Sequence, residues 1–404
     1  MDLVEHKKQV RKIYSPIPAS ILEDPLLNEL IAVFPPNYNF EFHKCIWRIE
    51  ELKKELGRNL TLVLQLPQGL QMFSCMLADF FEKYSHSDVF IVADENYGAC
   101  CIEDFGASLV NADFIIHYGH SCLVPITQTI VKALYVFVDI LFDVEHLVQT
   151  VAANFPDKSQ HLYLMSVIQF NSCLYLTKEK LSEIGYTNLT IPQEKPRAGG
   201  ETLGCTAPNL DDREDKRTVI FIADGRFHLE GSMIQNPKHT YYQYNPYEQI
   251  LTLEKYDYDQ MTKIRREQIF KVPITQVKNV GIILGMLGRQ GNPLILERMV
   301  QKVAGRFRFF VILISEIFPH QLKLFGDFFD FFVQIACPRL SIDWGTAFHK
   351  PLLNSFEFWC YLNESMPEKY ANDFYSENGG EWSNYYGQQK PRKKKIEVNL
   401  EATA

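Results

Sequence analysis

The sequence predicts an α/β protein built from three similar Rossmann-like domains, each with a parallel sheet. Three observations lead to this prediction. Apolar runs are continuous rather than alternating, which is typical of strands covered by helices on both faces of a parallel sheet. Strand-like and helix-like runs alternate in three blocks, near residues 56–150, 158–270 and 275–365. A chain of 404 residues is also long for a single core and has room for two or three domains.

The first block contains four strand-like runs and follows a helical, proline-interrupted extension over residues 1–55. Within that extension Ile46–Leu56 has apolar residues at helical spacing. The run at Leu60–Leu66 ends in a Pro-Gln-Gly turn, and Leu70–Phe81 has the pattern of a helix. The predicted strands of this block are Leu60–Leu66, Asp88–Asp94, Ala112–Tyr118 and Ala133–Ile140.

The same rhythm recurs in the other two blocks. The predicted helices are Leu174–Ile184 and Leu294–Val303, and the predicted strands are His161–Phe170, Thr218–Asp224, Asn279–Leu287, Phe307–Ser315 and Phe328–Ala336. Glycine-rich turns follow Ala223 and Leu284, as one follows Leu66 in the first block. We therefore predict α/β domains over residues 56–150, 151–272 and 273–370, followed by a polar, basic tail over 371–404.

Composition and charge exclude several classes of protein. The net charge is −8, the pI is near 5.8, and the sequence has no broad basic region interleaved with aromatics, so direct nucleic-acid binding is not expected. The start of the chain lacks the apolar core of a secretory signal, and nine scattered cysteines favour a reducing compartment. The most apolar runs are shorter than the roughly 20 residues that span a membrane. The sequence thus predicts a cytoplasmic protein without a membrane anchor.

Three cysteines, one in each block, are the strongest candidates for chemistry. Cys100, Cys205 and Cys337 each come after an apolar, strand-like run and are separated by about the length of a small domain. Three thiolates at a common centre could hold an iron–sulfur cluster and leave one iron open to a ligand. The three domains would then surround a shared iron–sulfur site. Cys101 is adjacent to Cys100, and in an extended chain the two point to opposite faces.

The spacing alone leaves other interpretations open. Structural zinc sites draw ligands in close pairs, and His117 with His120 is the nearest approach to one. Cys122 lies beside these histidines and is a further metal or active-site candidate, whereas Cys45, Cys75, Cys173 and Cys360 are expected to be small buried hydrophobes. The glycines of Gly285–Gly291 do not have the spacing of a dinucleotide-binding turn.

The residues around the three cysteines carry a resemblance to a known family. Five motifs occur in order: Tyr97-Gly-Ala-Cys-Cys-Ile-Glu-Asp104, His117-Tyr-Gly-His-Ser-Cys122, Gly200-Glu-Thr-Leu-Gly-Cys-Thr-Ala-Pro208, Asp224-Gly-Arg-Phe-His228 and Cys337-Pro-Arg-Leu-Ser-Ile-Asp343. Over roughly residues 40–365 the chain resembles the diphthamide-synthesis 3-amino-3-carboxypropyltransferases. It is most similar to their first eukaryotic subunit, because the second lacks the cysteine found here at Cys205.

The resemblance implies a radical transferase with a [4Fe–4S] cluster held by Cys100, Cys205 and Cys337. Cys100 is chosen over Cys101 because the family's Tyr-Gly-Ala-Cys element ends there. The family uses S-adenosylmethionine as substrate and transfers its 3-amino-3-carboxypropyl group to a histidine of translation elongation factor 2. It also implies a heterodimer with a paralogous second subunit and a small metal-binding protein as electron donor. The alternative is a non-catalytic scaffold or electron-relay subunit that carries a cluster.

Six further residues are candidates for binding S-adenosylmethionine. Open α/β sheets place ligands at the carboxyl ends of their strands, where the three turns carry Gln68, Arg226 and Arg289. The remaining candidates, Gly204, Arg339 and Asp343, flank Cys205 and Cys337, and His120 and His228 are equally compatible with a structural role. The basic run Lys390–Lys395 is expected to be a solvated tail, with nuclear targeting or partner docking as the alternative.

Overall fold

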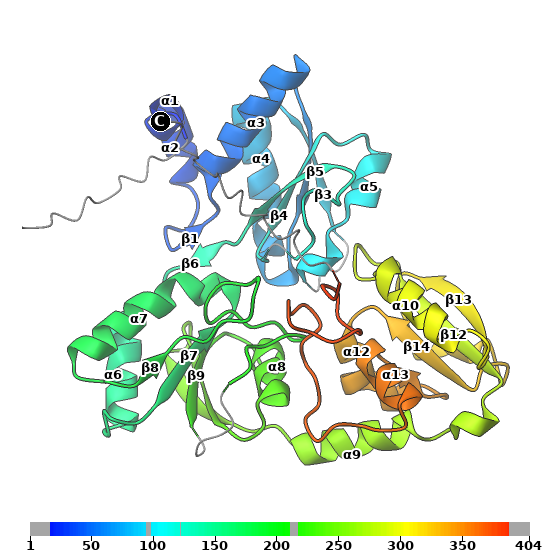
Figure 1. Ribbon diagram of the computed structural model, residues 1–404. Coiled ribbons are helices and arrows are strands. Elements are labelled where there is room, and N and C mark those ends of the chain that lie inside the picture. Colours follow the sequence, from blue (N-terminus) through cyan, green and yellow to red (C-terminus); the bar gives the residue numbers. More distant parts are fainter. Residues whose placement is uncertain (1–16, 94–97, 122, 211–216, 388–404) are drawn as a thin grey trace, which may run out of the picture. The chain divides into compact units, whose positions relative to one another are not determined.

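The computed structural model describes residues 17–93, 98–121, 123–210 and 217–387. Contacts within the chain divide it into two compact units. Unit 1 contains the described residues of Met1–Asn96, Asp104–Gly119 and Ile126–Val138, and unit 2 those of Tyr97–Glu103, His120–Pro125 and Asp139–Ala404. Unit 1 carries one four-stranded sheet, and unit 2 carries a five-stranded and a four-stranded sheet (Figure 1). The protein is thus of the predicted α/β class, while the boundaries of three domains stay a prediction.

Unit 1 is a parallel sheet in the order β3-β2-β4-β5, with helices packed on it. Three of the four predicted strands of this region are confirmed with shorter ends. The predicted helix Ile46–Leu56 lies within the longer helix Phe42–Leu56, and the predicted helix Leu70–Phe81 is divided between a 3₁₀ turn over Gln68–Phe73 and a helix that begins at Ser74. Its elements are α1 (Ala19–Leu22), α2 (Pro25–Ile31), β1 (Tyr38–Asn39), α3 (Phe42–Leu56), β2 (Thr61–Gln65), α4 (Ser74–Ser85), β3 (Asp88–Val92), α5 (Asp104–Leu109), β4 (Phe114–Tyr118) and β5 (Lys132–Val136).

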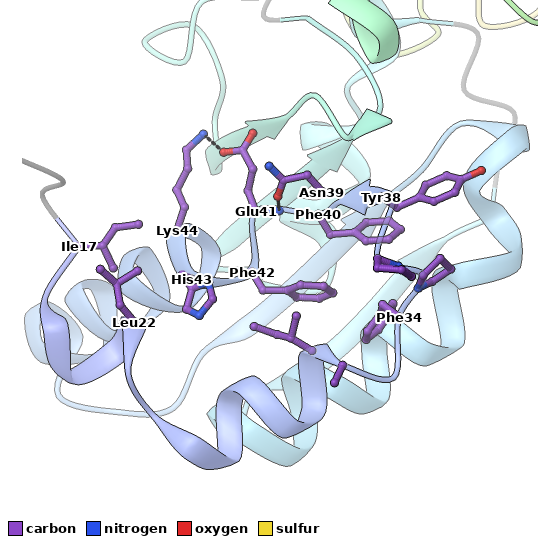
Figure 2. A pocket seen from close by; sticks show the side chains of 14 residues that line it. Ile17, Leu22, Phe34, Tyr38, Asn39, Phe40, Glu41, Phe42, His43 and Lys44 are labelled. Atoms are coloured by element: carbon purple, nitrogen blue, oxygen red, sulfur yellow. Dashed lines mark hydrogen bonds and ion pairs between the residues drawn. The ribbon is translucent and has the colours of Figure 1, made fainter. Parts of the chain in front are cut away.

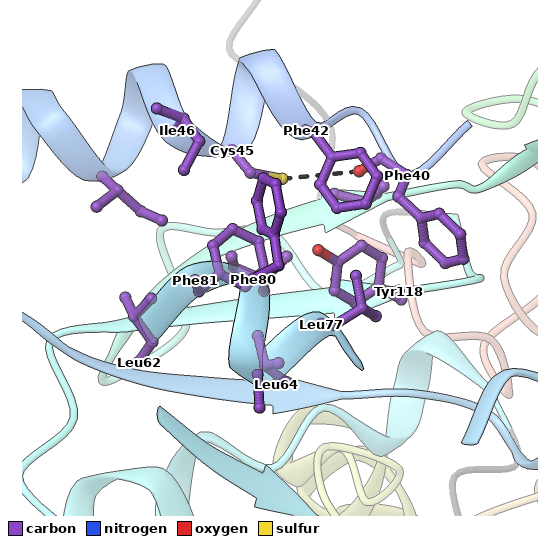
Figure 3. Close-up of a cluster of buried hydrophobic side chains, with 14 of the residues drawn as sticks. Phe40, Phe42, Cys45, Ile46, Leu62, Leu64, Leu77, Phe80, Phe81 and Tyr118 are labelled. Atoms are coloured by element: carbon purple, nitrogen blue, oxygen red, sulfur yellow. Dashed lines mark hydrogen bonds between the residues drawn. The ribbon is translucent and has the colours of Figure 1, made fainter. Parts of the chain in front are cut away.

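Both faces of the first sheet are covered, which explains the continuous apolar runs. On one face, Leu62 and Leu64 of β2 pack in a core with Phe80 and Phe81 of α4 and with α3 (Figure 3). On the other face a smaller cluster forms around Val63 and includes a residue of α5. Burying each of these large side chains stabilises the fold by about 1.5–3 kcal/mol.

One predicted strand of this region is divided. The run Ala133–Ile140 was expected to form a single strand, but β5 ends at Val136 and β6 (Asp139–Ile140) begins separately. Val138 lies between them with a φ of 59°, in the left-handed region that β-branched residues rarely adopt. The backbone therefore turns at Val138, and hydrophobicity alone does not reveal it.

Unit 2 contains two sheets, joined by helix α9. The second sheet has the order β11-β10-β9-β7-β8, and the third has the order β13-β12-β14-β15. Its elements besides β6 are α6 (Val144–Asn154), β7 (Leu162–Ser166), α7 (Asn171–Glu183), β8 (Leu189–Thr190), β9 (Thr218–Ile222), α8 (Phe227–Gln235), β10 (Thr240–Asn245), β11 (Ile250–Glu254), α9 (Tyr258–Ile269), β12 (Asn279–Gly285), α10 (Pro293–Val303), β13 (Arg308–Ile314), α11 (Pro319–Lys323), β14 (Phe331–Ile335), α12 (Pro338–Trp344), β15 (Leu352–Leu353) and α13 (Ser355–Leu362).

The third sheet is parallel throughout, whereas the second is mixed. In the second sheet β9 pairs in parallel with β7 and β10, and β11 returns antiparallel to β10 as an edge strand. The sequence predicts neither β10 nor β11. The predicted strand His161–Phe170 also stops at Ser166, because a 3₁₀ turn over Ile168–Phe170 follows it.

A buried ion pair links α9 to the third sheet. Arg265 of α9 forms hydrogen bonds of 2.6 and 2.8 Å with the carboxylate of Glu357 in α13, and both side chains are at most 1% exposed. The hydroxyl of Tyr370 donates to the same carboxylate over 2.9 Å. A Cβ on Gly345 would lie 2.2 Å from Nη1 of Arg265, so the guanidinium is closely packed.

The segment after α13 is not the simple polar tail that the sequence predicts. Asn372, Phe374, Tyr375 and Ser376 are buried, and the segment through Gly387 belongs to unit 2. The basic run Lys390–Lys395 lies outside the described residues. In the part of the chain that the structure describes, no helix combines the length and the hydrophobicity needed to cross a membrane.

Candidate metal centre

The three predicted cysteine ligands all lie in unit 2. Cys100 is in a short 3₁₀ helix, Ala99–Cys101, and Cys337 precedes the first residue of α12, just after β14. Cys205 was predicted to come directly after a strand. It lies instead within the loop between β8 and β9. All three are free thiols that are partly exposed, whereas Cys101 is buried.

The other cysteines are not grouped with these three. Cys45, Cys173 and Cys360 are buried, as predicted for small apolar side chains. The prediction is wrong for Cys75, which is exposed on α4. Cys122 lies outside the described residues.

The three partly exposed thiols influence one another electrostatically. Burial raises the pKa of Cys337 to about 12, with the charge of Cys205 contributing to the rise. The pKa of Cys100 is raised by its hydrogen bond with Cys101, by burial, and by the charges of Cys101, Cys337 and Cys205. Burial also raises the pKa of Cys205. The charges of Cys337 and Cys205 therefore act on the thiol of Cys100.

This donor set fits a cluster better than a single metal ion. Among the described residues, no three Cys, His, Asp or Glu side chains converge closely enough to hold one ion. A zinc ion needs its ligand atoms about 2.0–2.3 Å away, whereas a [4Fe–4S] cluster takes each cysteine on a different iron. The zinc alternative is therefore the weaker interpretation.

Close packing fixes the loop that carries Cys205. Helix α8 approaches this loop at Gly231, where a Cβ would lie 2.4 Å from the carbonyl oxygen of Leu203 and 2.8 Å from that of Gly204. A Cβ on Gly204 would in turn lie 2.2 Å from the ring of Phe227. Only glycine fits at these two positions without movement of the neighbouring atoms, so the candidate residue Gly204 helps to shape the loop at Cys205.

The turn after β12 holds the segment that contains Cys100 and Cys101. The backbone N–H of Arg289 donates to the carbonyl of Cys100 over 2.8 Å. The side-chain amide of Gln290 donates to the sulfur of Cys101 over 3.2 Å. Gly288 has a φ of 52°, and a Cβ there would lie 2.5 Å from the backbone of Cys101. The turn predicted to bind substrate thus lies directly beside Cys100.

Arg339 and Asp343 lie just after Cys337, as predicted, and they connect α12 to α8. Nε of Arg339 donates to both carboxylate oxygens of Asp343, at 2.9 and 3.0 Å. Its Nη1 donates to the carbonyl of Phe227 over 2.8 Å, and its Nη2 to Glu230 over 2.7 Å. The guanidinium carbon also lies 4.5 Å from the centroid of the Phe227 ring. Burial raises the pKa of Asp343 despite the opposing charge of Arg339.

The remaining candidates lie elsewhere. Gln68 is an exposed residue of unit 1, at the start of the 3₁₀ turn after β2. Arg226 is exposed at the start of α8, where it forms ion pairs with Glu230 and Glu254. Burial and, to a smaller extent, the charge of Arg339 lower the pKa of His228 to about 4, so this imidazole is neutral at physiological pH.

Sequence reasoning missed two features of the site. Glu201 is buried and accepts hydrogen bonds from the hydroxyl of Ser121 and the backbone N–H of Ala198, and burial raises its pKa. Glu201 lies within the motif Gly200–Pro208 that contains Cys205, so a carboxylate at this position could have been identified as a site residue from the sequence. Phe374, whose backbone N–H donates to the carbonyl of Cys205, comes from the segment that looked like a polar tail and gave no such signal.

Unit 1 also has a hollow of about 680 Å³ near its N-terminal helices (Figure 2). Its lining is mainly apolar and includes Ile17, Leu22, Phe34 and Phe42. An ion pair between Lys44 and Glu41 lies at its edge. Binding sites usually combine apolar walls with a few convergent polar groups. This hollow lacks the grouped thiols of unit 2, and we assign no chemistry to it.

The chain is similar to known proteins of one family. The family model described as "Putative diphthamide synthesis protein" matches residues 66–371. A Dictyostelium discoideum protein named 2-(3-amino-3-carboxypropyl)histidine synthase subunit 1 is 45% identical over 377 residues, which cover 91% of this chain and 78% of that protein. A human protein of the same name is 42% identical, covering 93% of this chain and 84% of that protein.

Solved structures support the fold. The crystal structure of Dph2 from Pyrococcus horikoshii aligns with a TM-score of 0.64 at 24% identity, covering 80% of this chain and 91% of that chain. A structure of Dph2 from the same organism, solved with a 4Fe-4S cluster, aligns with a TM-score of 0.64 at 25% identity. It covers 81% of this chain and 92% of that chain.

Proposed function

This chain belongs to the diphthamide synthesis protein family, and on that basis we propose that it is a 2-(3-amino-3-carboxypropyl)histidine synthase subunit. It acts in the first step of diphthamide synthesis. The observation that carries the proposal is the group of three partly exposed thiols in unit 2, which come from three distant parts of the sequence. Relatives at 42–45% identity over most of the chain carry the name of this synthase.

The proposed reaction transfers a 3-amino-3-carboxypropyl group from S-adenosylmethionine to a histidine of elongation factor 2. The bond between the sulfonium sulfur and the aminocarboxypropyl chain breaks, and methylthioadenosine leaves. A carbon–carbon bond to the imidazole forms with loss of a proton, so the overall transfer needs no net oxidant. A bound [4Fe–4S] cluster would supply the electron for this cleavage, and an equal electron would be given up again as the imidazole loses its proton. The cluster would also offer an iron open to S-adenosylmethionine, because three cysteines leave one iron without a protein ligand.

Cys100, Cys205 and Cys337 are the proposed ligands of this cluster. Cys100 is preferred over Cys101 because Cys100 is a partly exposed residue, whereas Cys101 is buried and its sulfur accepts a hydrogen bond from Gln290. The role of the protein is to hold the three thiolates at one centre and to keep the surroundings dry. The glycine contacts around Cys205 and the turn beside Cys100 provide this fixed geometry.

The six further candidates remain proposals as S-adenosylmethionine contacts. Gly204 and Arg289 are the strongest, because each lies next to a cysteine-bearing loop of unit 2. An arginine pairs well with a carboxylate such as that of the aminocarboxypropyl group. Arg339 and Asp343 are proposed to support the substrate pocket through their contacts with α8. Gln68 and Arg226 are the weakest, because both are exposed.

We propose three protein partners and a cytoplasmic location. The relatives are named as subunits, which implies a complex, and we propose a heterodimer with a paralogous second subunit. Elongation factor 2 is the protein substrate, and a small metal-binding protein delivers electrons. Nine cysteines without a regular pairing pattern are compatible with a reducing compartment.

The test is an anaerobic assay of the chain with its partner subunit, S-adenosylmethionine and a reductant. We expect methylthioadenosine to form when the partner's own cluster ligands are mutated, and to disappear when Cys337→Ala is introduced into this chain. Cys75→Ala, at an exposed cysteine of unit 1, is the matched control and should retain activity. Cleavage that survives Cys337→Ala would favour the scaffold alternative.

A further inference from the structure

The segment after α13 packs along the loop that carries Cys205. Asp373 forms an antiparallel bridge with Thr206. The backbone N–H of Phe374 donates to the carbonyl of Cys205 over 3.1 Å. The segment is therefore bonded to the backbone of Cys205 itself and to the residue that follows it. We call residues 371–387 the C-terminal strap.

Asn372 fixes this end of the strap. Its side chain is 2% exposed, and its amide donates to the carbonyl of Gly204 over 3.3 Å and to that of Gly231 over 2.8 Å. Its backbone N–H donates to the side chain of Gln235 over 2.8 Å. Since Gly231 and Gln235 belong to α8, the single residue Asn372 joins the strap to the Cys205 loop and to this helix.

The other end of the strap is bonded to the element that follows the Cys100 turn. Asn292 is the residue that caps α10, and its side-chain amide donates to the side chain of Asn384 over 2.7 Å. It comes directly after the turn in which the N–H of Arg289 donates to the carbonyl of Cys100. Arg298 of α10 donates to two further strap carbonyls, each over 2.9 Å. The strap therefore connects the Cys205 loop with the turn that holds Cys100.

The strap between these two ends is itself held in shape. The indole N–H of Trp382 donates to Asp373 over 2.7 Å, which closes the strap on itself. The hydroxyl of Ser355 in α13 donates to the carbonyl of Trp382 over 3.0 Å. The family model matches residues 66–371, so nearly the whole strap lies beyond the region that the model describes.

We propose that the C-terminal strap is a positioning element of the cluster site, which sets the separation of Cys205 and Cys100 through Asn372 and Asn384. The inference rests on the proposed function, because it concerns the ligands of the proposed cluster. Metal sites depend on the groups that orient their ligands, and a small displacement of a ligand weakens binding. The strap thus extends the site with residues that contact neither the cluster nor the substrate.

The first test needs no cluster. The metal-free full chain carrying Asn372→Asp is compared with the native chain in the rate at which iodoacetamide alkylates Cys205, followed by peptide mass spectrometry. Aspartate keeps the size of the side chain but turns a carboxylate oxygen toward two carbonyls, so the loop should open more often and alkylation should be several-fold faster. The exposed Cys75 is the reference thiol within each chain. Asn154→Asp, which removes an exposed amide-to-carbonyl hydrogen bond in α6, is the matched control and should match the native chain.

The second test uses the full chain reconstituted anaerobically with the partner subunit, whose own cluster ligands have been mutated. Asn384→Leu keeps the approximate shape and removes the oxygen that accepts from Asn292. We expect Asn372→Asp and Asn384→Leu each to release iron to a chelator several-fold faster than the native chain. The electron-paramagnetic spectrum of the reduced cluster should also have altered g values. Because both substitutions interrupt one connection, the double variant should release iron little faster than the more affected single variant.

The possible results separate the role of the strap from the proposed function. Native alkylation, iron release and spectra in both single variants reject the role of the strap alone, since the cluster is then present. Additive effects with a native spectrum also reject it, because they indicate two separate structural contributions. A native chain that binds no cluster rejects both proposals. If Asn372→Asp does not fold, the iron release and spectrum of Asn384→Leu decide the matter.

Discussion

Arg339 and Glu230 form an ion pair of 2.7 Å that connects the first turn after Cys337 to helix α8. The same helix contacts the Cys205 loop at Gly231. Helix α8 therefore fixes two of the three proposed cluster ligands relative to each other. Because a cluster tolerates little displacement of its ligands, substitutions at these contacts should affect metal binding as well as stability.

Replacing Arg339 with Met should destabilise the protein and weaken cluster binding. The side chain is 4% exposed and pairs with Asp343 and Glu230, so the substitution leaves Asp343 without its partner and Glu230 with Arg226 alone. Breaking a buried ion pair typically costs about 3–5 kcal/mol. Chemical unfolding and iron content measure the two effects. The exposed Arg226→Met serves as control, with a cost of at most about 1 kcal/mol. Equal losses in the two variants would contradict this account.

Gly231→Ala should displace the Cys205 loop. The added Cβ would lie 2.4 Å from the carbonyl oxygen of Leu203, and backbone cannot move away as a flexible side chain can. We expect reduced iron and sulfide per chain in a protein that still folds. Gly225→Ala is the matched control, because a Cβ there meets nothing within 4 Å. If both alanine variants bind iron like the native chain, the glycine contact does not position Cys205.

The buried pair Arg265–Glu357 should be important for stability but not for chemistry. Glu357→Gln keeps the shape of the side chain and leaves the guanidinium of Arg265 without a countercharge, at an expected cost of about 3–5 kcal/mol. Denaturant unfolding measures this loss. Lys180→Met breaks an exposed ion pair with Glu145 and should change the stability little. A small effect at Glu357 would show that solvent or a neighbour replaces the lost charge.

Stability should fall in mild acid because of His161. Burial and the charge of Arg217 lower the pKa of this imidazole below its ordinary 6.5. Nη1 of Arg217 lies 2.6 Å from Nδ1 of His161, which therefore accepts, and Nε2 lies 2.8 Å from the Thr190 hydroxyl. The folded state thus binds fewer protons than the unfolded state as the pH falls through 6.5. The contribution of the neutral His161 side chain to the stability of the fold is therefore complete above pH 6.5 and is lost as the pH falls below it.

His161→Gln tests this pH dependence, because the amide can keep both hydrogen bonds but does not titrate. Urea unfolding at pH 7 and pH 5 should show a smaller loss of stability for the variant than for the native chain. His349→Gln, at an exposed histidine, is the control and should keep the native slope. An unchanged slope in His161→Gln would assign the acid sensitivity to other groups.

The fold was predictable where strands are buried on both faces. β2, β4, β9 and β14 are almost wholly buried and appear in the sequence as uninterrupted apolar runs. The hairpin of β10 and β11 was not predicted, because β11 lies at the sheet edge and is largely exposed. Its five residues include Thr252 and Glu254, so no continuous apolar run marks the strand. The break at Val138 depends on backbone conformation, which hydrophobicity does not encode.

The candidate site was predictable to the extent that motifs surround it. Cys100, Cys205 and Cys337 were identified from their surroundings, and the structure brings them into one unit. The role of Arg339 in clamping α8 was not predictable, because Glu230 lies far from it in sequence. The contact of Phe374 with Cys205 was missed for the same reason, since a hydrogen bond across a long sequence separation leaves no local pattern.

The central claim is that Cys100, Cys205 and Cys337 together hold an iron–sulfur cluster. The most direct test is iron and acid-labile sulfide per chain after anaerobic purification of the native chain, Cys205→Ala and the exposed control Cys75→Ala. We predict near-equal iron and sulfide in the native chain and the control, and a marked loss of both in Cys205→Ala. Zinc without iron, or an iron content that does not depend on Cys205, would contradict the account.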